Sequence, residues 1–165
     1  MEKADLSFIE ICLSGGDKLP LESQVKIQVF LKVHHAKANL CIGYGATETS
    51  AGSACMTNDN FRYESVGYPY LNNVMEVFDV DTGEKVQGYG QVGELRISAP
   101  TLMLGYFGEH SDETNKVIWT DENGVRWYRT GDLAHFDSDG FLYIDGRIKP
   151  IITRRGFKIY PSYVE

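Results

Sequence analysis

The sequence predicts a mixed α/β fold with two parts of different character. In residues 1–65, an apolar run ends in a glycine turn, a helix-like stretch follows, and a second apolar run ends in another glycine-rich turn. This alternation of strand and helix signals predicts a βα sheet portion. From residue 66 onwards, short strand-like runs separated by turn signals predict a small antiparallel barrel or sandwich.

Composition and charge narrow the classes of function. The 165 residues include 16 Lys plus Arg against 23 Asp plus Glu, a formal net charge of -7, so nucleic acid is not an expected partner. An anionic nucleotide would need local positive groups or magnesium. No signal peptide is recognisable, and no apolar run approaches the roughly 20 residues of a membrane span. The odd number of cysteines favours free buried thiols, and we expect a cytoplasmic protein.

The first strand is predicted over the apolar residues 8–13 and ends in the turn Ser14-Gly15-Gly16-Asp17. The two glycines permit a close approach of the backbone, either to a ligand or in an ordinary strand-to-helix turn. Pro20 then opens a predicted helix over residues 21–38. Its apolar residues at four-residue spacing are expected to cover the sheet: Leu21, Val25, Val29 and Val33.

The run from residue 43 to residue 50, Gly-Tyr-Gly-Ala-Thr-Glu-Thr-Ser, follows the apolar residues 40–42. It is therefore expected at the end of a buried strand, where ligands often bind. Its residue types would suit a nucleotide: Tyr44 offers an aromatic face, Thr47 a hydroxyl for phosphate, and Glu48 a hard oxygen ligand for magnesium. The alternative is a glycine-rich turn in which the tyrosine packs and the glutamate is solvated.

The β-rich part contains strand-like runs at residues 74–80 and 93–98, with a hairpin-type turn at residues 81–83. A short helix is expected at residues 111–117, where Ser111 is a candidate N-cap ahead of two acidic residues. Two further strands are expected on either side of Ser138-Asp139-Gly140.

A second candidate ligand site lies near the end of the chain. Asp132 would accept two hydrogen bonds from a ribose diol, or it would cap backbone amides in a turn. Arg147 would face a nucleotide, or it would be solvated like most charged clusters. Pro150 after Lys149 predicts a hinge, and the chain ends at Glu165 within a helical pattern, from which we expect a fragment.

Taken together, these runs resemble the adenylate-forming enzymes, the superfamily of acyl-CoA synthetases, firefly luciferase and the adenylation domains of nonribosomal peptide synthetases. The resemblance covers nearly the whole chain and is closest to the acid:CoA ligases. Five runs in family order carry it: residues 14–17, residues 43–48, Gly93-Glu94-Leu95 with Gly105-Tyr106, residues 128–133, and residues 146–156.

The resemblance implies that the fold is the C-terminal portion of a large adenylation domain. Residues 1–65 would be the βα portion of this N-terminal domain, residues 66–148 its small antiparallel β-barrel subdomain, and residues 149–165 the hinge and the start of a small C-terminal domain. A phosphate loop before residue 15 and the lysine that the small domain contributes to adenylation are missing from the sequence. We therefore expect the isolated fragment to be inactive and to self-associate through its uncovered face.

The resemblance also implies roles for individual residues. Gly15, Gly16, Asp17 and Tyr44 would hold the adenine, Asp132 and Arg147 the ribose, and Thr47 the α-phosphate, while Glu48 would bind Mg²⁺ and act with Thr47 in catalysis. Gly43 and Gly45 would leave room for the acyl group. Lys149 would be the hinge, and Gly156 would lie on the loop that approaches the thiol. Pro150 departs from the acidic residue common in the family, which puts the freedom of the hinge in doubt.

The predicted function is that of an ATP-dependent carboxylic acid:CoA ligase. Such an enzyme forms an acyl-adenylate with release of pyrophosphate and then an acyl-CoA thioester, and it requires ATP, Mg²⁺ and CoA besides the acid. Two alternatives stay open. One is an adenylation domain that loads the phosphopantetheine arm of a carrier protein, and the other is a non-catalytic fragment that binds a nucleotide or a partner.

Overall fold

The computed structural model describes residues 4–148, 152–154 and 157–159. Its helical segments are α1 (Leu21–Val33), α2 (Thr114–Val117) and the 3₁₀ turns η1 (Thr47–Thr49) and η2 (Gly108–Glu113). Its strands are β1 (Cys12–Ser14), β2 (Leu40–Ala46), β3 (Ala51–Cys55), β4 (Ser65–Pro69), β5 (Val74–Phe78), β6 (Gly93–Ser98), β7 (Ile118–Thr120), β8 (Arg126–Phe136), β9 (Leu142–Arg147), β10 (Ile152–Arg154) and β11 (Phe157–Ile159). The predicted mixed α/β class is confirmed.

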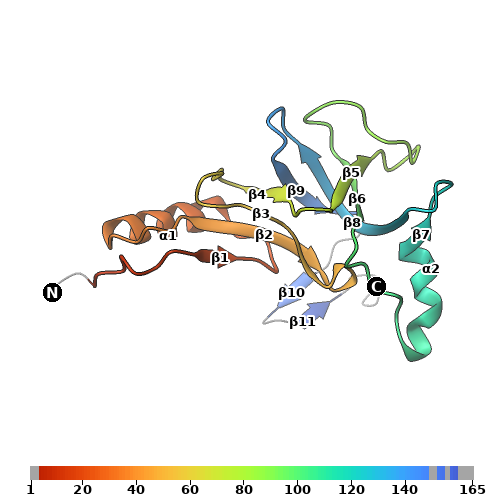
Figure 1. The fold of residues 1–165 in the computed structure, drawn as a ribbon, viewed down its shortest axis with the longest axis horizontal. Coiled ribbons are helices and arrows are strands. Elements are labelled where there is room, and N and C mark those ends of the chain that lie inside the picture. Colours follow the sequence, from red (N-terminus) through yellow and green to blue (C-terminus); the bar gives the residue numbers. More distant parts are fainter. Residues whose placement is uncertain (1–3, 149–151, 155–156, 160–165) are drawn as a thin grey trace.

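One sheet connects the two parts of the chain. Its strands follow the order β1-β2-β3-β4-β9-β8-β6-β5, and β7 pairs with the first residues of β8. β1 and β2 run parallel, whereas the strands from β3 onwards pair antiparallel with their neighbours. In Figure 1, β2 and β3 cross the middle of the molecule, and β5, β6 and β8 rise steeply from them. β10 and β11 form a separate antiparallel pair.

β4 is the strand that joins the two parts. It pairs with β3 through Pro69 opposite Ala54, and with β9 through Ser65 opposite Tyr143. The boundary expected between the βα portion (residues 1–65) and the β-rich portion (residues 66–148) therefore falls within β4, which pairs with strands of both portions. The strands after it are antiparallel, as predicted, and they continue the first part of the sheet.

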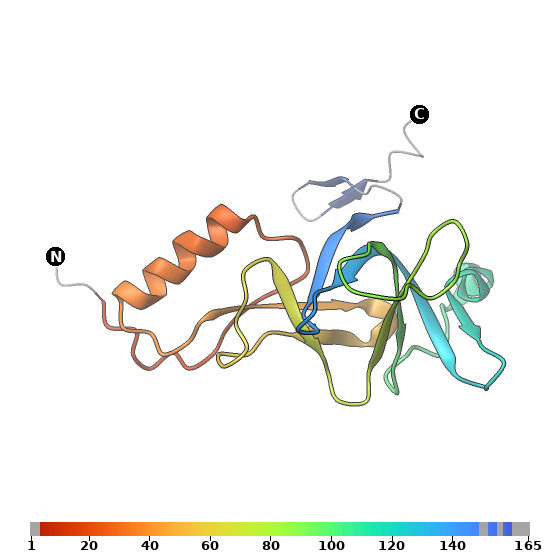
Figure 2. The same ribbon diagram turned by 90° about the horizontal axis from the view of Figure 1, so that it is seen from above.

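The helix α1 lies along one side of β1 and β2 (Figure 2), but it turns a different face to them than the sequence predicts. Leu31 and Gln24 are the buried residues of this helix. The prediction that a stripe of four apolar residues covers the sheet is wrong, because these side chains are between 38% and 55% exposed: Leu21, Val25, Val29 and Val33. Within the described residues, no helix is long and apolar enough to cross a membrane.

The inward face of α1 is set by backbone groups that need partners. The Gln24 side-chain amide donates to the Leu19 carbonyl oxygen (2.7 Å), and the Gln28 side chain accepts the N–H of Leu40 at the start of β2 (2.8 Å). Buried backbone groups without partners are costly, so these two glutamines belong on the sheet side. The helix ends at residue 33 rather than 38 because His35 takes a left-handed conformation, with φ of 63°.

Elsewhere the predicted elements are found, with some changes of length. The strand predicted over residues 93–98 is β6, whereas β1 occupies only the end of the predicted strand and its turn. β5 stops at residue 78 because the Asp79 carboxylate accepts the N–H groups of Asp81 and Thr82 and forms the turn. The helix expected at residues 111–117 is a 3₁₀ turn followed by one turn of α-helix.

The buried apolar side chains form one cluster that spans both parts of the chain. It includes Leu31 on α1, Ile42 on β2, Leu95 on β6 and Leu142 on β9, and the last two are fully buried. Because adjoining strands share this core, β2 is held in a fixed position relative to β8 and β9. This matters for function, since these three strands carry the candidate site.

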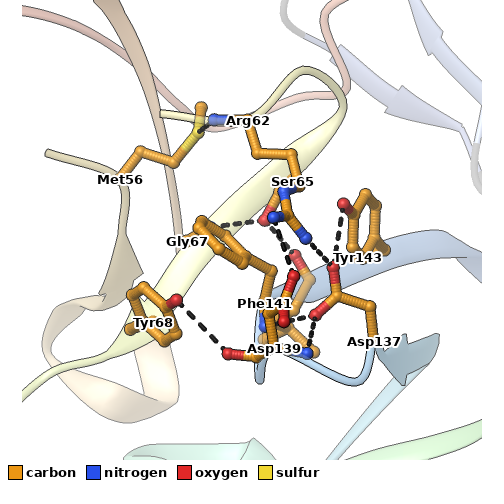
Figure 3. A network of polar contacts seen from close by, with 10 residues as sticks. Met56, Arg62, Ser65, Gly67, Tyr68, Asp137, Asp139, Phe141 and Tyr143 are labelled. Atoms are coloured by element: carbon orange, nitrogen blue, oxygen red, sulfur yellow. Dashed lines mark hydrogen bonds and ion pairs between the residues drawn. The ribbon is translucent and has the colours of Figure 1, made fainter. Parts of the chain in front are cut away.

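A network around Arg62 ties the segment before β4 to the turn between β8 and β9 (Figure 3). The Arg62 guanidinium pairs with Asp137 (2.5 Å) and with Asp139 (2.9 Å), and it lies over the Phe141 ring, 4.2 Å from the centroid. The other oxygen of Asp137 accepts the N–H groups of Asp139 and Phe141. Partial burial opposes ionisation of Asp137, but the Phe141 amide and Arg62 outweigh it and hold the pKa below its usual value.

Replacing Asp137 with asparagine is expected to lower the free energy of unfolding by about 1 kcal/mol at pH 7, because a charge-assisted network is lost. A depressed pKa makes the ionised carboxylate stabilising above its unfolded-state pKa of about 3.9, and this contribution disappears as the pH falls through the folded-state value. The difference from wild type should therefore shrink at about pH 3. Urea unfolding at both pH values checks this, with exposed Asp112→Asn as control. An equal difference at both pH values would contradict it.

Candidate functional site

Two adjoining cavities open where residues of β2, β8 and β9 meet. Their volumes are about 1290 Å³ and about 410 Å³. The larger cavity also takes in Gly15, Thr47 and Glu48, and the smaller one takes in Asp17. The residues that line both are Gly16, Gly43, Tyr44, Gly45, Asp132 and Arg147. Every site residue predicted between positions 15 and 147 thus lines one of these cavities.

The glycine turn after β1 lies against the backbone of β2. A Cβ atom on Gly15 would be 3.1 Å from the carbonyl oxygen of Gly43, and Gly16 has a φ of 91°. Glycine is therefore favoured at position 15 because the two backbones approach closely, and at position 16 because the backbone has a positive φ. Asp17 is exposed and accepts the N–H of Lys18 (2.7 Å), so it makes the local contact expected of an ordinary turn while also lining the smaller cavity.

Strand packing gives a reason for glycine at position 45 but not at position 43. A Cβ on Gly45 would collide with the backbone carbonyl of Ala51, because β2 and β3 have an irregular register at this point. A Cβ on Gly43 would make an ordinary contact, 3.4 Å from the carbonyl oxygen of Ala54. Both glycines line the larger cavity, and their expected role in making room for an acyl group stays a prediction.

The turn after β2 is held by Thr49, a residue to which the sequence analysis gives no role. Its buried hydroxyl donates to the carbonyl oxygen of Ala46 (2.9 Å) and accepts the N–H of the same residue (3.2 Å). Just beyond, Ala51 has a φ of 104°, a backbone conformation that residues with side chains rarely adopt. This tight connection presents Thr47 and Glu48 to the larger cavity.

The Glu48 carboxylate has a defined position in the cavity wall. Its Oε1 atom accepts a hydrogen bond from the Tyr106 hydroxyl (2.5 Å), and Tyr128 lines the same cavity. Tyr128 is 6% exposed. Burial, followed by the charge of Glu48, raises the pKa of Tyr128, so its phenol stays protonated and able to donate. These contacts favour the ligand-site interpretation over a solvated glutamate.

Asp132 joins residues from three strands. Its Oδ2 atom accepts a hydrogen bond from the Tyr44 hydroxyl (2.5 Å), and its Oδ1 atom pairs with Nε of Arg147 (2.7 Å). Asp132 and Arg147 lie directly opposite each other on β8 and β9, whereas Tyr44 comes from β2, which is not a neighbour of β8 in the sheet. A carboxylate oxygen can accept more than one hydrogen bond, so both oxygens keep capacity for a ligand.

Burial and two neighbouring groups act in opposite directions on the ionisation of Asp132. Burial raises its pKa, and the hydrogen bond from Tyr44 and the charge of Arg147 only partly oppose this rise. Burial, with the charge of Asp132, also raises the pKa of Tyr44, which remains a phenol donor at neutral pH. A carboxylate that has lost water on burial gains from additional hydroxyl donors.

Charged side chains of both signs line the larger cavity. Arg129 is exposed and its guanidinium lies over the Trp119 ring, 5.4 Å from the centroid. Lys116 pairs with Glu113 (2.6 Å), and Arg147 pairs with Asp132. These three cations share the lining with the carboxylates of Glu48, Glu94, Glu113 and Asp132, so the positive groups expected beside an anionic nucleotide stay a prediction.

The metal role expected of Glu48 depends on ligands from outside the protein. In the part of the chain that the structure describes, no group of three or more His, Cys, Asp and Glu side chains is placed to hold a metal ion. Mg²⁺ is commonly bound by one or two carboxylates together with waters and substrate phosphates. Of the four carboxylates that line the larger cavity, Glu94, Glu113 and Asp132 pair with cations, whereas Glu48 accepts from a tyrosine hydroxyl. A carboxylate that is held by a neutral donor fits that pattern, and the metal role of Glu48 stays a prediction.

The structure also brings in side chains that the sequence analysis did not assign. Tyr106 and Tyr128 belong to the quoted motif runs, but no spacing rule connects either of them with Glu48. The only sequence signal for a role of these two tyrosines is that each lies in one of the motif runs. Lys149 and Gly156, the expected hinge and thiol-side loop, lie outside the described residues.

The sequence of this chain matches a family model and the sequences of known proteins. A family model described as AMP-binding enzyme matches residues 1–107. Among curated proteins, the chain is 36% identical over 165 residues to "4-coumarate--CoA ligase-like 2" of Arabidopsis thaliana and 36% identical over 170 residues to "Long-chain-fatty-acid--CoA ligase" of Bacillus subtilis. These alignments cover 99% and 100% of this chain but 27% and 28% of the two relatives, so the chain spans little more than a quarter of their length.

A solved structure extends the comparison to the fold. The crystal structure of a long-chain-fatty-acid-CoA ligase from Archaeoglobus fulgidus superposes with a TM-score of 0.78, covering 90% of this chain and 30% of that chain. The two sequences are 23% identical, so this similarity shows the fold alone. It confirms the prediction that the chain has the fold of part of an adenylation domain.

Proposed function

Because the chain belongs to the AMP-binding enzyme family, as its motifs predict, we propose that its protein is an AMP-forming ligase that joins a carboxylic acid to CoA. The observation that carries this proposal is the cluster of Tyr44, Asp132 and Arg147 on the same cavity wall as Glu48. The names of the two curated relatives favour CoA over a carrier protein as the acceptor.

In this proposal the smaller cavity and its shared wall hold the nucleoside. Gly15, Gly16 and Asp17 border one side of the adenine, and the ring of Tyr44 borders the other. The ribose hydroxyls donate to the carboxylate of Asp132, whose position is fixed by its hydrogen bond from Tyr44 and its pair with Arg147. Burial of Asp132 supports this role, because a desolvated carboxylate favours hydroxyl donors.

The phosphate groups would then lie in the larger cavity. Thr47 would contact the α-phosphate with its hydroxyl, and Glu48 would hold Mg²⁺, which would offset negative charge on the phosphate oxygens. Arg129, whose guanidinium lies over the Trp119 ring in the cavity lining, would add positive charge for the phosphates. Gly43 and Gly45 border the acyl group.

The reaction needs little proton transfer. A carboxylate oxygen of the acid attacks the α-phosphorus of ATP, the bond from that phosphorus to the bridging oxygen breaks, and pyrophosphate leaves. The thiolate of CoA then attacks the carbonyl carbon of the acyl-adenylate, and AMP leaves. Residues of this chain would contribute by orienting the nucleotide and by placing hydrogen-bond donors and cations around the phosphates.

The proposal includes the domain organisation expected from the sequence. Residues 1–65 and 66–148 would be the two portions of the large domain, and residues 149–165 would begin the small one, with Lys149 as the hinge and Gly156 on the thiol side. The free thiols of Cys12, Cys41 and Cys55 suit the cytoplasmic setting that we propose. Self-association of the isolated chain would cover the exposed apolar side of α1.

Carboxylate-dependent release of pyrophosphate from ATP, measured with and without CoA, tests the function. The assay uses a panel of aromatic and aliphatic acids, with the longest natural protein that contains this chain beside the 165-residue chain itself. We expect release by the longer protein, an acyl-CoA product when CoA is added, and no turnover by the short chain. No release with any acid would overturn the ligase proposal, and release without an acyl-CoA product would favour a carrier-protein acceptor.

A further inference from the structure

We infer that Tyr106 is a positioning residue that holds the Glu48 carboxylate in the orientation needed to bind a divalent cation. The inference deepens the proposed function and rests on it, because it takes Glu48 as the metal ligand. It gives a role to a tyrosine in the loop after β6 that the proposed nucleotide contacts do not use.

The hydroxyl of Tyr106 meets the Glu48 carboxylate directly, 2.5 Å from its Oε1 atom. Tyr128, which is buried and packs in the hydrophobic core, lines the same cavity and gives this part of the wall a fixed position. The phenol donor therefore restricts a side chain that would otherwise rotate more freely on the short turn η1.

The loop that carries Tyr106 is anchored to its surroundings by main-chain contacts. The N–H of Met103 donates to the carbonyl oxygen of Glu48 (2.8 Å), and the N–H of Tyr106 donates to the Thr114 hydroxyl (2.8 Å). Gly105 lies so close to Thr114 that a Cβ would be 3.0 Å from its Oγ1 atom. These contacts anchor the loop through groups other than the Tyr106 hydroxyl, which donates to the Glu48 carboxylate.

Orientation matters for the cation expected here. Mg²⁺ demands near-ideal octahedral geometry and gives up its waters reluctantly, so a ligand that must first be ordered binds it less well. A phenol donating to one oxygen of a carboxylate leaves acceptor capacity on both oxygens for the cation. Partners of this kind, which hydrogen-bond to a metal ligand, typically change metal affinity by about 10- to 100-fold when removed.

The inference is tested by calorimetric binding of ATP to the longest natural protein that contains this chain, with excess MgCl₂ and again with EDTA. Tyr106→Phe removes the hydroxyl and keeps the ring. We expect it to weaken binding of ATP in MgCl₂ by about tenfold and to leave binding in EDTA unchanged. Combined with Glu48→Gln, it should cause no further loss, because the hydroxyl acts through that carboxylate.

Tyr68→Phe is the matched control, since the Tyr68 hydroxyl contacts the Asp139 carbonyl oxygen away from the cavity (3.3 Å). It should change neither titration. Equal weakening with and without magnesium in Tyr106→Phe would overturn the inference and leave only a structural role. If Glu48→Gln weakens magnesium-dependent binding and Tyr106→Phe does not, the inference is wrong while the metal role stands. If neither variant has an effect, the role of Glu48 fails as well.

Discussion

Asp132→Ala is expected to weaken binding of AMP by about 10- to 100-fold. The variant removes the buried carboxylate that would accept the ribose hydroxyls, and hydrogen bonds to a charged group contribute about 1.5 to 3 kcal/mol. It also leaves the Tyr44 hydroxyl and the Arg147 guanidinium without their shared partner in the cavity wall. Isothermal titration calorimetry with AMP measures the loss, and thermal unfolding of the same samples shows whether the fold persists.

A matched control is available on the same hairpin. Asp139 lies in the turn between β8 and β9, where it pairs with Arg62 outside both cavities, and its side chain is 62% exposed. Asp139→Ala should therefore bind AMP like the wild type. Asp132→Asn, which keeps the shape but not the charge, should fall between wild type and alanine. Wild-type affinity in Asp132→Ala would remove this residue from the ribose site.

Glu48→Gln is expected to raise the magnesium concentration for half-maximal pyrophosphate release by about 10- to 100-fold. Glutamine keeps the length of the side chain and an oxygen that accepts from Tyr106, but it lacks the negative charge that a hard divalent cation prefers. The rise is measured by magnesium titration at saturating ATP in the longest natural protein that contains this chain. The maximal rate at saturating magnesium should fall less than the rate at low magnesium.

Glu122→Gln serves as the control for this titration, because Glu122 is exposed in the turn between β7 and β8. It should have the magnesium dependence of the wild type. If Glu48→Gln also has an unaltered titration curve, the metal is held elsewhere, and the hydrogen bond from Tyr106 then needs a different explanation.

The glycine turns illustrate what local sequence can predict. Gly16 has a positive φ, so its residue type follows from local geometry. The strand at residues 93–98 and the turn at Asp79 likewise depend on alternation and on side chains that bond to nearby amides. These features depend on neighbours within a few residues, and sequence patterns record such neighbours.

The helix α1 illustrates where the same reasoning fails. The spacing of Val25, Val29 and Val33 shows that an apolar stripe exists, but not which surface it meets. In the structure the sheet side carries Gln24 and Leu31, because backbone groups of adjoining segments need the glutamine as a partner. A periodic pattern describes one element, whereas burial is decided by the element and its partner together.

The sequence by itself determined the fold class, the family and a subset of the residues that line the cavities. Only the tertiary structure decided which of them touch: Tyr44 meets Asp132 across 88 positions, and Tyr106 meets Glu48 across 58. The physical reason is that motif spacing reports local backbone geometry, while these hydrogen bonds join segments that are far apart in the sequence and meet only in the folded chain. The polar contacts on which the proposed chemistry depends are therefore a product of the folded sheet.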